Sequence, residues 1–235
     1  MLGPYPQSRP VTMRSFFTPI IFLFLARFAV AQNVTGVGVT PEEAKQGYVS
    51  LFDGQTLLAW FGDIRHYAVE DGTMVCHGGD VYVHKPYANF ILRFDFKLPP
   101  GGNNGVGIRA PGKGDAAYLG MEIQILDDGN EMYQKMNPLL QPWQCHGSIY
   151  GVVPARRGFL KPTGQWNSEE ILADGSHIKV TLNGTVITDA DISQITETPD
   201  GKPHPGLHNR KGYIGWLGHD RDPVAFRNVR IKELP

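Results

Sequence analysis

Short stretches in which apolar and polar residues alternate recur along this chain, with turn signals between them. In residues 90–98, Phe and Leu occupy one set of alternate positions, and Arg, Asp and Lys occupy most of the other. A period of two is typical of a β-strand with one packed face. Asp–Gly and Asn–Gly pairs, which tolerate the positive φ of tight hairpin turns, begin at residues 53, 71, 128, 174, 183 and 200. The chain therefore predicts a series of antiparallel hairpins.

The predicted fold class is all-β, an antiparallel two-sheet jelly-roll sandwich. Only residues 41–44 suggest a turn of helix, and the 28 glycines and 18 prolines suit a fold rich in turns. About twelve strands are more than an immunoglobulin-type domain contains, whereas a jelly roll with a concave sheet accommodates them. The expected strands are 67–70, 73–76, 81–84, 90–98, 106–109, 118–126, 148–152, 166–172, 177–183, 185–189, 213–217 and 225–232.

The N-terminus has the pattern of a secretory signal peptide at residues 1–31. A basic Met13-Arg14-Ser15 precedes an apolar run from Phe16 to Leu25, and Ala29-Val30-Ala31 forms a small-residue cleavage site. The apolar run is shorter than the roughly 20 residues that span a bilayer, although an uncleaved anchor is the alternative. We expect a secreted or periplasmic protein without stable membrane insertion after cleavage.

The expected mature chain has a polar lead-in at residues 32–46 and a single β-sandwich domain at residues 47–235. Removing residues 1–31 takes away three arginines and no acidic residue, so the net charge falls from −1 to −4. A mildly acidic chain without a basic run gives no support to nucleic-acid binding. The cysteines, Cys76 and Cys145, either pair in an oxidising compartment or remain buried thiols.

The most informative stretch for function is residues 119–126. Its alternation places Met121, Ile123 and Ile125 on one face, and Glu122 and Gln124 on the other. A carboxylate in a partly dry pocket has a raised pKa and can act as a general base near neutral pH. The alternative is a solvated Glu122 that pairs with Arg109 or Arg230.

A second strand, in residues 103–109, is predicted to contribute to the same site. Val106 and Ile108 are expected in the core, while Gly105, Gly107 and Arg109 share the opposite face. Glycines beside an arginine leave room for a ligand to lie against the sheet. Arg109, together with Asn104 and Gln124, is therefore predicted to bind a polar substrate.

Histidine, aspartate and tryptophan complete the candidate site. His146 and His219 adjoin glycines in expected loops or strand ends, where an imidazole can transfer protons. Trp143 and Trp216 could stack on a sugar ring, although core packing is the alternative for each. Asp127 either contacts a ligand or belongs to a plain turn. No residues have the fixed spacing of a metal site, and a divalent metal at Glu122 is left open.

Several motifs in order resemble those of the bacterial 3-keto-disaccharide hydrolase family over residues 46–235. They include residues 47–54, 103–109, 121–127, 146–151, 164–167, 182–184, 212–216 and 226–231. The resemblance implies a concanavalin A-like sandwich in a secreted or periplasmic protein. It also implies substrates that are glycosides oxidised at C3, supplied by an upstream sugar 3-dehydrogenase.

The implied reaction begins with removal of the proton at C2, which the C3 ketone acidifies. The C1 substituent then leaves, and water adds back. Glu122 or His146 would be the base, Arg109 and Gln124 would donate hydrogen bonds to the sugar or the enolate, and His219 would protonate the leaving oxygen. A metal at Glu122 would polarise the ketone instead. A non-catalytic carbohydrate-binding module is the main alternative, because the fold alone does not separate it from an enzyme.

Overall fold

The computed structural model describes residues 3, 36–136, 138–219 and 223–235. The predicted signal peptide and its cleavage site lie outside these residues, apart from Gly3. Among the described residues, no helix is both long enough and apolar enough to cross a membrane.

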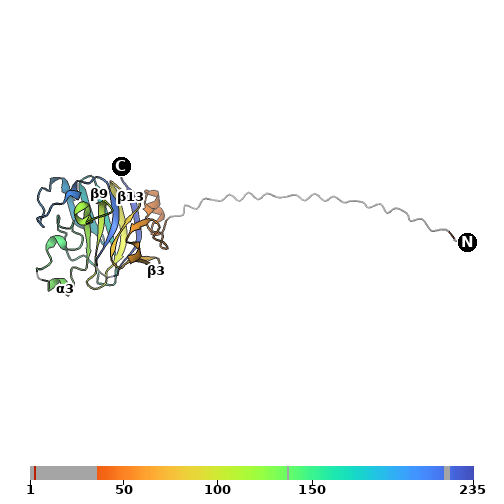
Figure 1. Ribbon diagram of the computed structural model, residues 1–235, viewed down its shortest axis with the longest axis horizontal. Coiled ribbons are helices and arrows are strands. Elements are labelled where there is room, and N and C mark those ends of the chain that lie inside the picture. Colours follow the sequence, from red (N-terminus) through yellow and green to blue (C-terminus); the bar gives the residue numbers. More distant parts are fainter. Residues whose placement is uncertain (1–2, 4–35, 137, 220–222) are drawn as a thin grey trace. The chain divides into compact units, whose positions relative to one another are not determined.

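Two antiparallel sheets make up the fold (Figure 1). In the described part of the chain, the larger sheet has eight strands, in the order β11 (Thr185–Asp191), β10 (His177–Leu182), β9 (Trp166–Asp174), β6 (Phe90–Lys97), β13 (Val224–Glu233), β4 (Thr73–Cys76) and β3 (Tyr67–Glu70), with β1 (Val49–Ser50) paired to β13. The smaller sheet has five strands, in the order β2 (Trp60–Gly62), β5 (Gly79–Val83), β12 (Tyr213–Gly218), β7 (Asn103–Ala110) and β8 (Met121–Leu126). These sheets confirm the predicted all-β sandwich.

Helical segments in the described residues are short. They are α1 (Pro41–Lys45), α2 (Ala116–Leu119) and α3 (Glu131–Gln134), with 3₁₀ turns η1 (Ile64–His66), η2 (Pro142–Gln144), η3 (Ile192–Gln194) and η4 (Pro205–His208). In Figure 1, α3 lies at the periphery of the domain, beyond the strands.

The core fills the space between the sheets with the apolar faces of their strands. Trp216 of β12 stacks on Phe226 of β13, with ring centroids 4.2 Å apart, and also contacts Phe94 of β6. Val106 of β7 and Ile123 of β8 are fully buried in the same cluster. The alternation predicted for β6, β7 and β8 is therefore the alternation between core and outer face.

Two expected strands differ in the structure. Residues 148–152 form a loop, in which Ile149 makes only isolated bridges to Ile123 and Val153. Residues 118 and 119 belong to α2, because the carboxylate of Asp115 accepts the Ala117 N–H and caps a helical turn before β8 begins. Both cysteines are buried free thiols, so the alternative of a disulfide is wrong.

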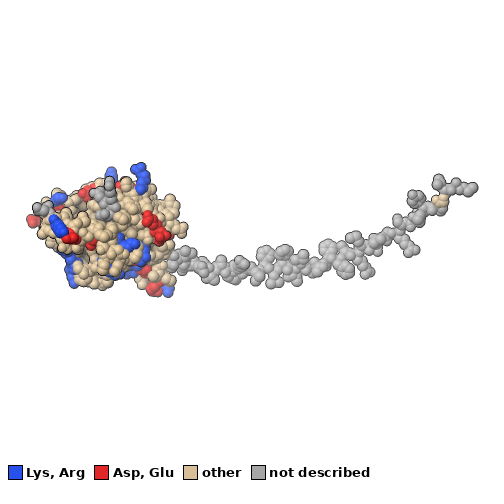
Figure 2. All heavy atoms as spheres, turned by 90° about the horizontal axis from the view of Figure 1, so that it is seen from below, with Lys and Arg blue, Asp and Glu red and all other residues tan. Residues whose placement is uncertain are grey.

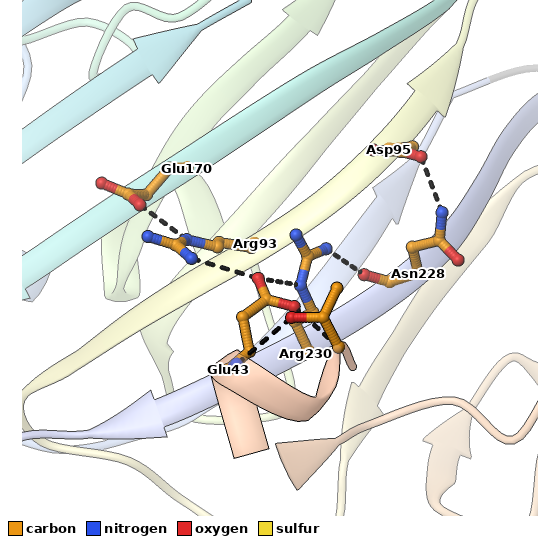
Figure 3. Close-up of polar contacts among 7 residues, drawn as sticks. Glu43, Arg93, Asp95, Glu170, Asn228 and Arg230 are labelled. Carbon is orange, nitrogen blue, oxygen red and sulfur yellow. Dashed lines mark hydrogen bonds and ion pairs between the residues drawn. The ribbon is translucent and has the colours of Figure 1, made fainter. Parts of the chain in front are cut away.

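A polar network fixes α1 to the outer face of the larger sheet (Figure 3). The carboxylate of Glu43 accepts hydrogen bonds from Arg93 of β6 and Arg230 of β13, at 3.1 and 2.7 Å. Burial by itself raises the pKa of Glu43, but hydrogen bonds from Thr40, Arg230 and Arg93 outweigh it and lower that pKa to about 2. Arg230 therefore binds Glu43 on the larger sheet, whereas Glu122 of the predicted site lies on the smaller sheet.

On the face shown in Figure 2, Lys and Arg side chains are interspersed with Asp and Glu and do not gather in one patch.

Candidate functional site

A pocket of about 350 Å³ lies on the face of the smaller sheet that points away from the core. Strands β7 and β8 provide its floor, and the segments around α2, α3 and η2 provide its walls. The lining residues are Asn103, Asp115, Ala117, Tyr118, Glu122, Gln124, Leu126, Tyr133, Met136, Leu140, Gln144, Tyr150, Lys202 and His219. The structure therefore brings together three of the predicted site residues, namely Glu122, Gln124 and His219.

Glu122 is a buried carboxyl group at the floor of this pocket. Its side chain is almost inaccessible, and its Oε1 has no hydrogen-bond partner among the described residues. Burial, together with the negative charges of Asp115 and Asp80, raises the pKa of Glu122 to about 8. A carboxylate in this state is a strong base when ionised and a proton donor when neutral, as acid–base catalysis near neutral pH requires.

Glycine at position 105 makes room for this carboxyl group. A β-carbon there would lie 2.0 Å from Glu122 Oε1, so any larger residue would displace the carboxyl. At Gly107, by contrast, the nearest group to a β-carbon would be the flexible end of Leu217, at 3.2 Å. The room that was predicted for a ligand above these two glycines is instead taken by the protein's own side chains, Glu122 above Gly105 and Leu217 above Gly107.

His219 approaches the same carboxyl from the end of β12. Its Nε2 lies 4.0 Å from Glu122 Oε1, which is too far for a direct hydrogen bond. The imidazole side chain is 54% exposed and can therefore exchange protons with solvent. This arrangement leaves a basic and an acidic group facing one pocket without neutralising one another.

Gln124 and Asn103 lie side by side next to Glu122. Gln124 Nε2 donates to Asn103 Oδ1 at 3.1 Å, while Gln124 Oε1 is buried without a partner among the described residues. A buried acceptor of this kind is satisfied when a ligand hydroxyl donates to it. Asn103, which projects from the outer face of β7, takes the place that was predicted for Asn104.

Several polar residues of the pocket wall, among them Lys202, Tyr118 and Tyr150, were not among the predicted site residues. Lys202 Nζ donates to the Tyr118 hydroxyl at 2.9 Å, and Tyr150 accepts a hydrogen bond from Gln144. Tyr118 packs on His204, whose Nε2 lies 3.0 Å from the buried carboxylate of Asp200. Tyr150 stands in the motif at residues 146–151, but no sequence signal marks Lys202, because the loop at 196–204 meets α2 only in the folded chain.

Arg109 was predicted to line the site, and the structure places it elsewhere. Its backbone φ of 49° turns the side chain out of the alternation of β7. The buried guanidinium donates to the carbonyls of Ala88 and Gly175 at 3.0 and 2.7 Å, and burial lowers its pKa. Arg109 is thus a structural residue that ties loops together at the end of the sheet.

His146 was predicted as a catalytic residue, and it lies inside the sandwich. Its ring stacks on Phe96, its Nδ1 accepts the Leu126 N–H, and its Nε2 approaches Glu169 Oε2 of β9 at 3.0 Å. The side chains of His146 and Glu169 are 3% and 0% exposed. Because the main chain of β8 separates His146 from the pocket, it does not face the substrate site.

Asn104 and Trp216 were predicted to bind substrate, and both point into the interior. Asn104 Nδ2 donates to Cys76 Sγ at 3.2 Å. Trp216 is fully buried between Trp60 and Phe226. Adjacent residues of a strand point to opposite faces, and both residues belong to the set that faces the core.

Asp127 and Trp143 lie near the pocket without lining it. Asp127 accepts hydrogen bonds from the Gly101 N–H and Asn130. It therefore belongs to a plain turn, which was the alternative role predicted for it. Trp143 packs edge-on against Tyr150, with centroids 5.4 Å apart. It therefore supports a residue of the wall.

A metal at Glu122 would need further ligands nearby. Within residues 36–136, 138–219 and 223–235, no group of three or more His, Cys, Asp or Glu side chains is arranged to hold a metal ion.

Comparisons with known proteins agree with this architecture. The model of a family described as the 3-keto-alpha-glucoside-1,2-lyase-like domain matches residues 47–232. A 3-keto-disaccharide hydrolase of Bacteroides thetaiotaomicron is 25% identical to this chain. The match covers 80% of this chain and 79% of that protein.

Solved structures with the same fold include two Parabacteroides distasonis proteins assigned to the glycosyl hydrolases. One has a TM-score of 0.71 at 31% identity and covers 80% of this chain and 99% of its own. The other has a TM-score of 0.75 at 27% identity, with coverage of 84% and 98%. A Bacillus subtilis protein with a galectin-like fold, at a TM-score of 0.50 and 11% identity over 79% of this chain and 94% of its own, is similar in fold alone.

Proposed function

The chain belongs to the family of 3-keto-alpha-glucoside-1,2-lyase-like domains, and on that premise we propose that it cleaves glycosides oxidised at C3 by elimination followed by hydration. The observation that carries this proposal is Glu122, a buried carboxyl group with a pKa of about 8 that faces a pocket and whose Oε1 has no hydrogen-bond partner among the described residues. Abstraction of a C2 proton requires such a base, whereas a site that only binds sugar does not require one.

In the first step, the Glu122 carboxylate takes the C2 proton, and the electron pair of the C–H bond forms an enolate with its charge on the C3 oxygen. The C3 ketone makes this proton acidic. Hydrogen-bond donors that face the pocket stabilise the enolate oxygen as charge develops. We assign that role to the Lys202–Tyr118 pair, which supplies the positive charge that had been predicted for Arg109, whereas Gln124 Oε1 accepts a hydrogen bond from a sugar hydroxyl.

In the second step, the ketone re-forms, a C1–C2 double bond forms, and the C1–O bond breaks. His219 gives a proton to the leaving oxygen. Water then adds its hydroxyl to C1 and gives its other proton to His219, and Glu122 returns the proton to C2. The net reaction consumes one water and releases an alcohol and a 3-keto sugar, so the paired carboxylates of ordinary glycosidases are not required.

The same proposal includes the cellular setting inferred from the sequence. The substrate must be made by a sugar 3-dehydrogenase that acts upstream, and the signal-like segment at 1–31 favours a secreted or periplasmic protein.

The test is incubation of the purified chain with a 3-keto-glucoside and with its unoxidised parent, following release of the aglycone. We expect release from the keto sugar alone, and its loss in Glu122→Gln. Binding of either sugar without release would instead indicate a lectin-like module and would overturn the catalytic roles.

A further inference from the structure

The pocket has two ends of different chemistry. Glu122, Gln124 and Leu126 face it in succession along β8, with neighbours roughly 7 Å apart. The Glu122 end is polar, since Asp115 acts on the pKa of Glu122 and Tyr118 pairs with Lys202. Leu126 lies at the opposite end, where it pairs with Asn103 at the start of β7.

Apolar side chains from the segment after β8 also line the pocket. Tyr133 is anchored beside the start of β7, which pairs with Leu126, by a hydrogen bond from its hydroxyl to the Gly101 carbonyl at 2.7 Å. Met136 and Leu140 line the same pocket, and Met136 is 45% exposed. Large apolar side chains left open to solvent at a pocket favour contact with an apolar ligand.

Asn103 is the polar neighbour of Leu126, and it accepts a hydrogen bond from Gln124. The Tyr133 hydroxyl donates to the Gly101 carbonyl, and Gln144 accepts from the Gln141 N–H while it donates to Tyr150. The several hydroxyls of a second sugar would therefore lose water here without gaining an equal number of partners, which is unfavourable. A ring without hydroxyls would bury apolar surface at no such cost.

We propose that Leu126, Tyr133, Met136 and Leu140 form the leaving-group subsite, and that its preferred occupant is an apolar ring in place of a second sugar. This inference rests on the proposed function, because it assigns the 3-keto sugar to the Glu122 end. Methionine suits the task, since its flexible thioether adapts to rings of different shape and makes favourable contacts with them.

The kinetic test compares the 3-keto derivative of cyclohexyl glucoside with a 3-keto-disaccharide of the same anomeric configuration. Cyclohexanol is a poorer leaving group than a sugar hydroxyl, so intrinsic reactivity works against the expected result. We expect a kcat/KM about tenfold higher for the cyclohexyl compound. Equal values, or a preference for the disaccharide, would overturn the subsite.

Variants locate the effect. Met136→Gln and Leu140→Asn should lower kcat/KM for the cyclohexyl compound about tenfold, with a clearly smaller loss for the disaccharide. Met132→Gln and Leu139→Asn are matched controls, because both side chains are exposed and neither lines the pocket. Equal losses for both substrates in the pocket variants would contradict the proposal.

A binding measurement separates this inference from the proposed reaction. Unoxidised cyclohexyl and methyl glucosides are titrated by saturation-transfer NMR into the wild-type protein and Met136→Gln. If neither keto sugar is cleaved, the proposed function fails, yet binding of the cyclohexyl compound about tenfold tighter than the methyl compound, lost in Met136→Gln, upholds the subsite. Equal binding of the two compounds overturns it.

Discussion

The carboxyl group of Glu122 sits in the space that a side chain at position 105 would fill. Its Oε1 lies 2.0 Å from the place of a β-carbon at Gly105, on the neighbouring strand of the same sheet. Position 105 pairs with Gln124, so Gly105 and Glu122 are diagonal neighbours on one face. An absent side chain on β7 therefore determines where the proposed base can stand.

Gly105→Ala should lower kcat about 100-fold, because a methyl group there displaces the Glu122 carboxyl by an ångström or more. Gly107→Ala is the matched control on the same face of the same strand, where only the end of Leu217 must move, and it should keep most activity. Steady-state kinetics of both variants on a 3-keto-glucoside would check this. Equal losses of activity in the two variants would show that the space above Gly105 has no special role in positioning the Glu122 carboxyl.

The activity of the wild-type protein should rise with pH. The pKa of Glu122 is about 8, so most of the base is protonated at pH 7, and its ionised fraction increases through pH 8. Where removal of the C2 proton limits kcat/KM, proton donation by His219 comes after the limiting step, so the expected pH profile climbs about tenfold from pH 6.5 to pH 8. A flat profile across that range would exclude Glu122 as the group whose ionisation limits the reaction.

Glu122→Gln should change stability in a pH-dependent way. The folded-state pKa is raised above the unfolded value of 4.5, so the contribution of Glu122 to stability is fully present below pH 4.5 and is lost as the pH rises through about 8. The loss is on the order of 5 kcal/mol. In thermal unfolding, the variant should gain on the wild type between pH 5 and pH 9. A constant difference would contradict the raised pKa.

His219→Asn should lower kcat about 100-fold while leaving stability nearly unchanged. The imidazole is 54% exposed, so its replacement disturbs little packing. A series of leaving groups provides the sharper test, since loss of the acid should affect poor leaving groups more than good ones. An equal loss across the series would argue against proton donation by His219.

Arg109→Met should lower stability while leaving catalysis nearly unchanged, which is the reverse of the result expected for His219→Asn. Removal of the buried guanidinium takes its hydrogen bonds away from the carbonyls of Ala88 and Gly175, which are half-buried, and this should cost about 2–4 kcal/mol of stability. Below the unfolding transition, KM and kcat should stay within about twofold of the wild type. A large rise in KM with unchanged Tm would return Arg109 to the substrate site.

The strand pattern could be predicted from the sequence because side chains in a strand alternate, whatever the strand packs against. That local rule placed Ile123 in the core and Glu122 and Gln124 on the outer face of β8, and it predicted most of the hairpins. The rule could not show that Asp115 would cap a helical turn before β8, nor that the loop containing Ile149 would make only isolated bridges.

The membership of the site depended on tertiary structure. Strand alternation predicted that Arg109 would share a face with Gly105 and Gly107, and an expected loop position favoured His146, yet a positive φ at Arg109 and an inward position for His146 separate both from the pocket. Lys202 and Tyr118, 84 residues apart in the chain, meet only because the loop before η4 packs on α2. The sequence by itself determined which face of each strand is polar, since that follows from local periodicity, whereas the fold decided which polar groups share a pocket, since that depends on contacts between distant segments.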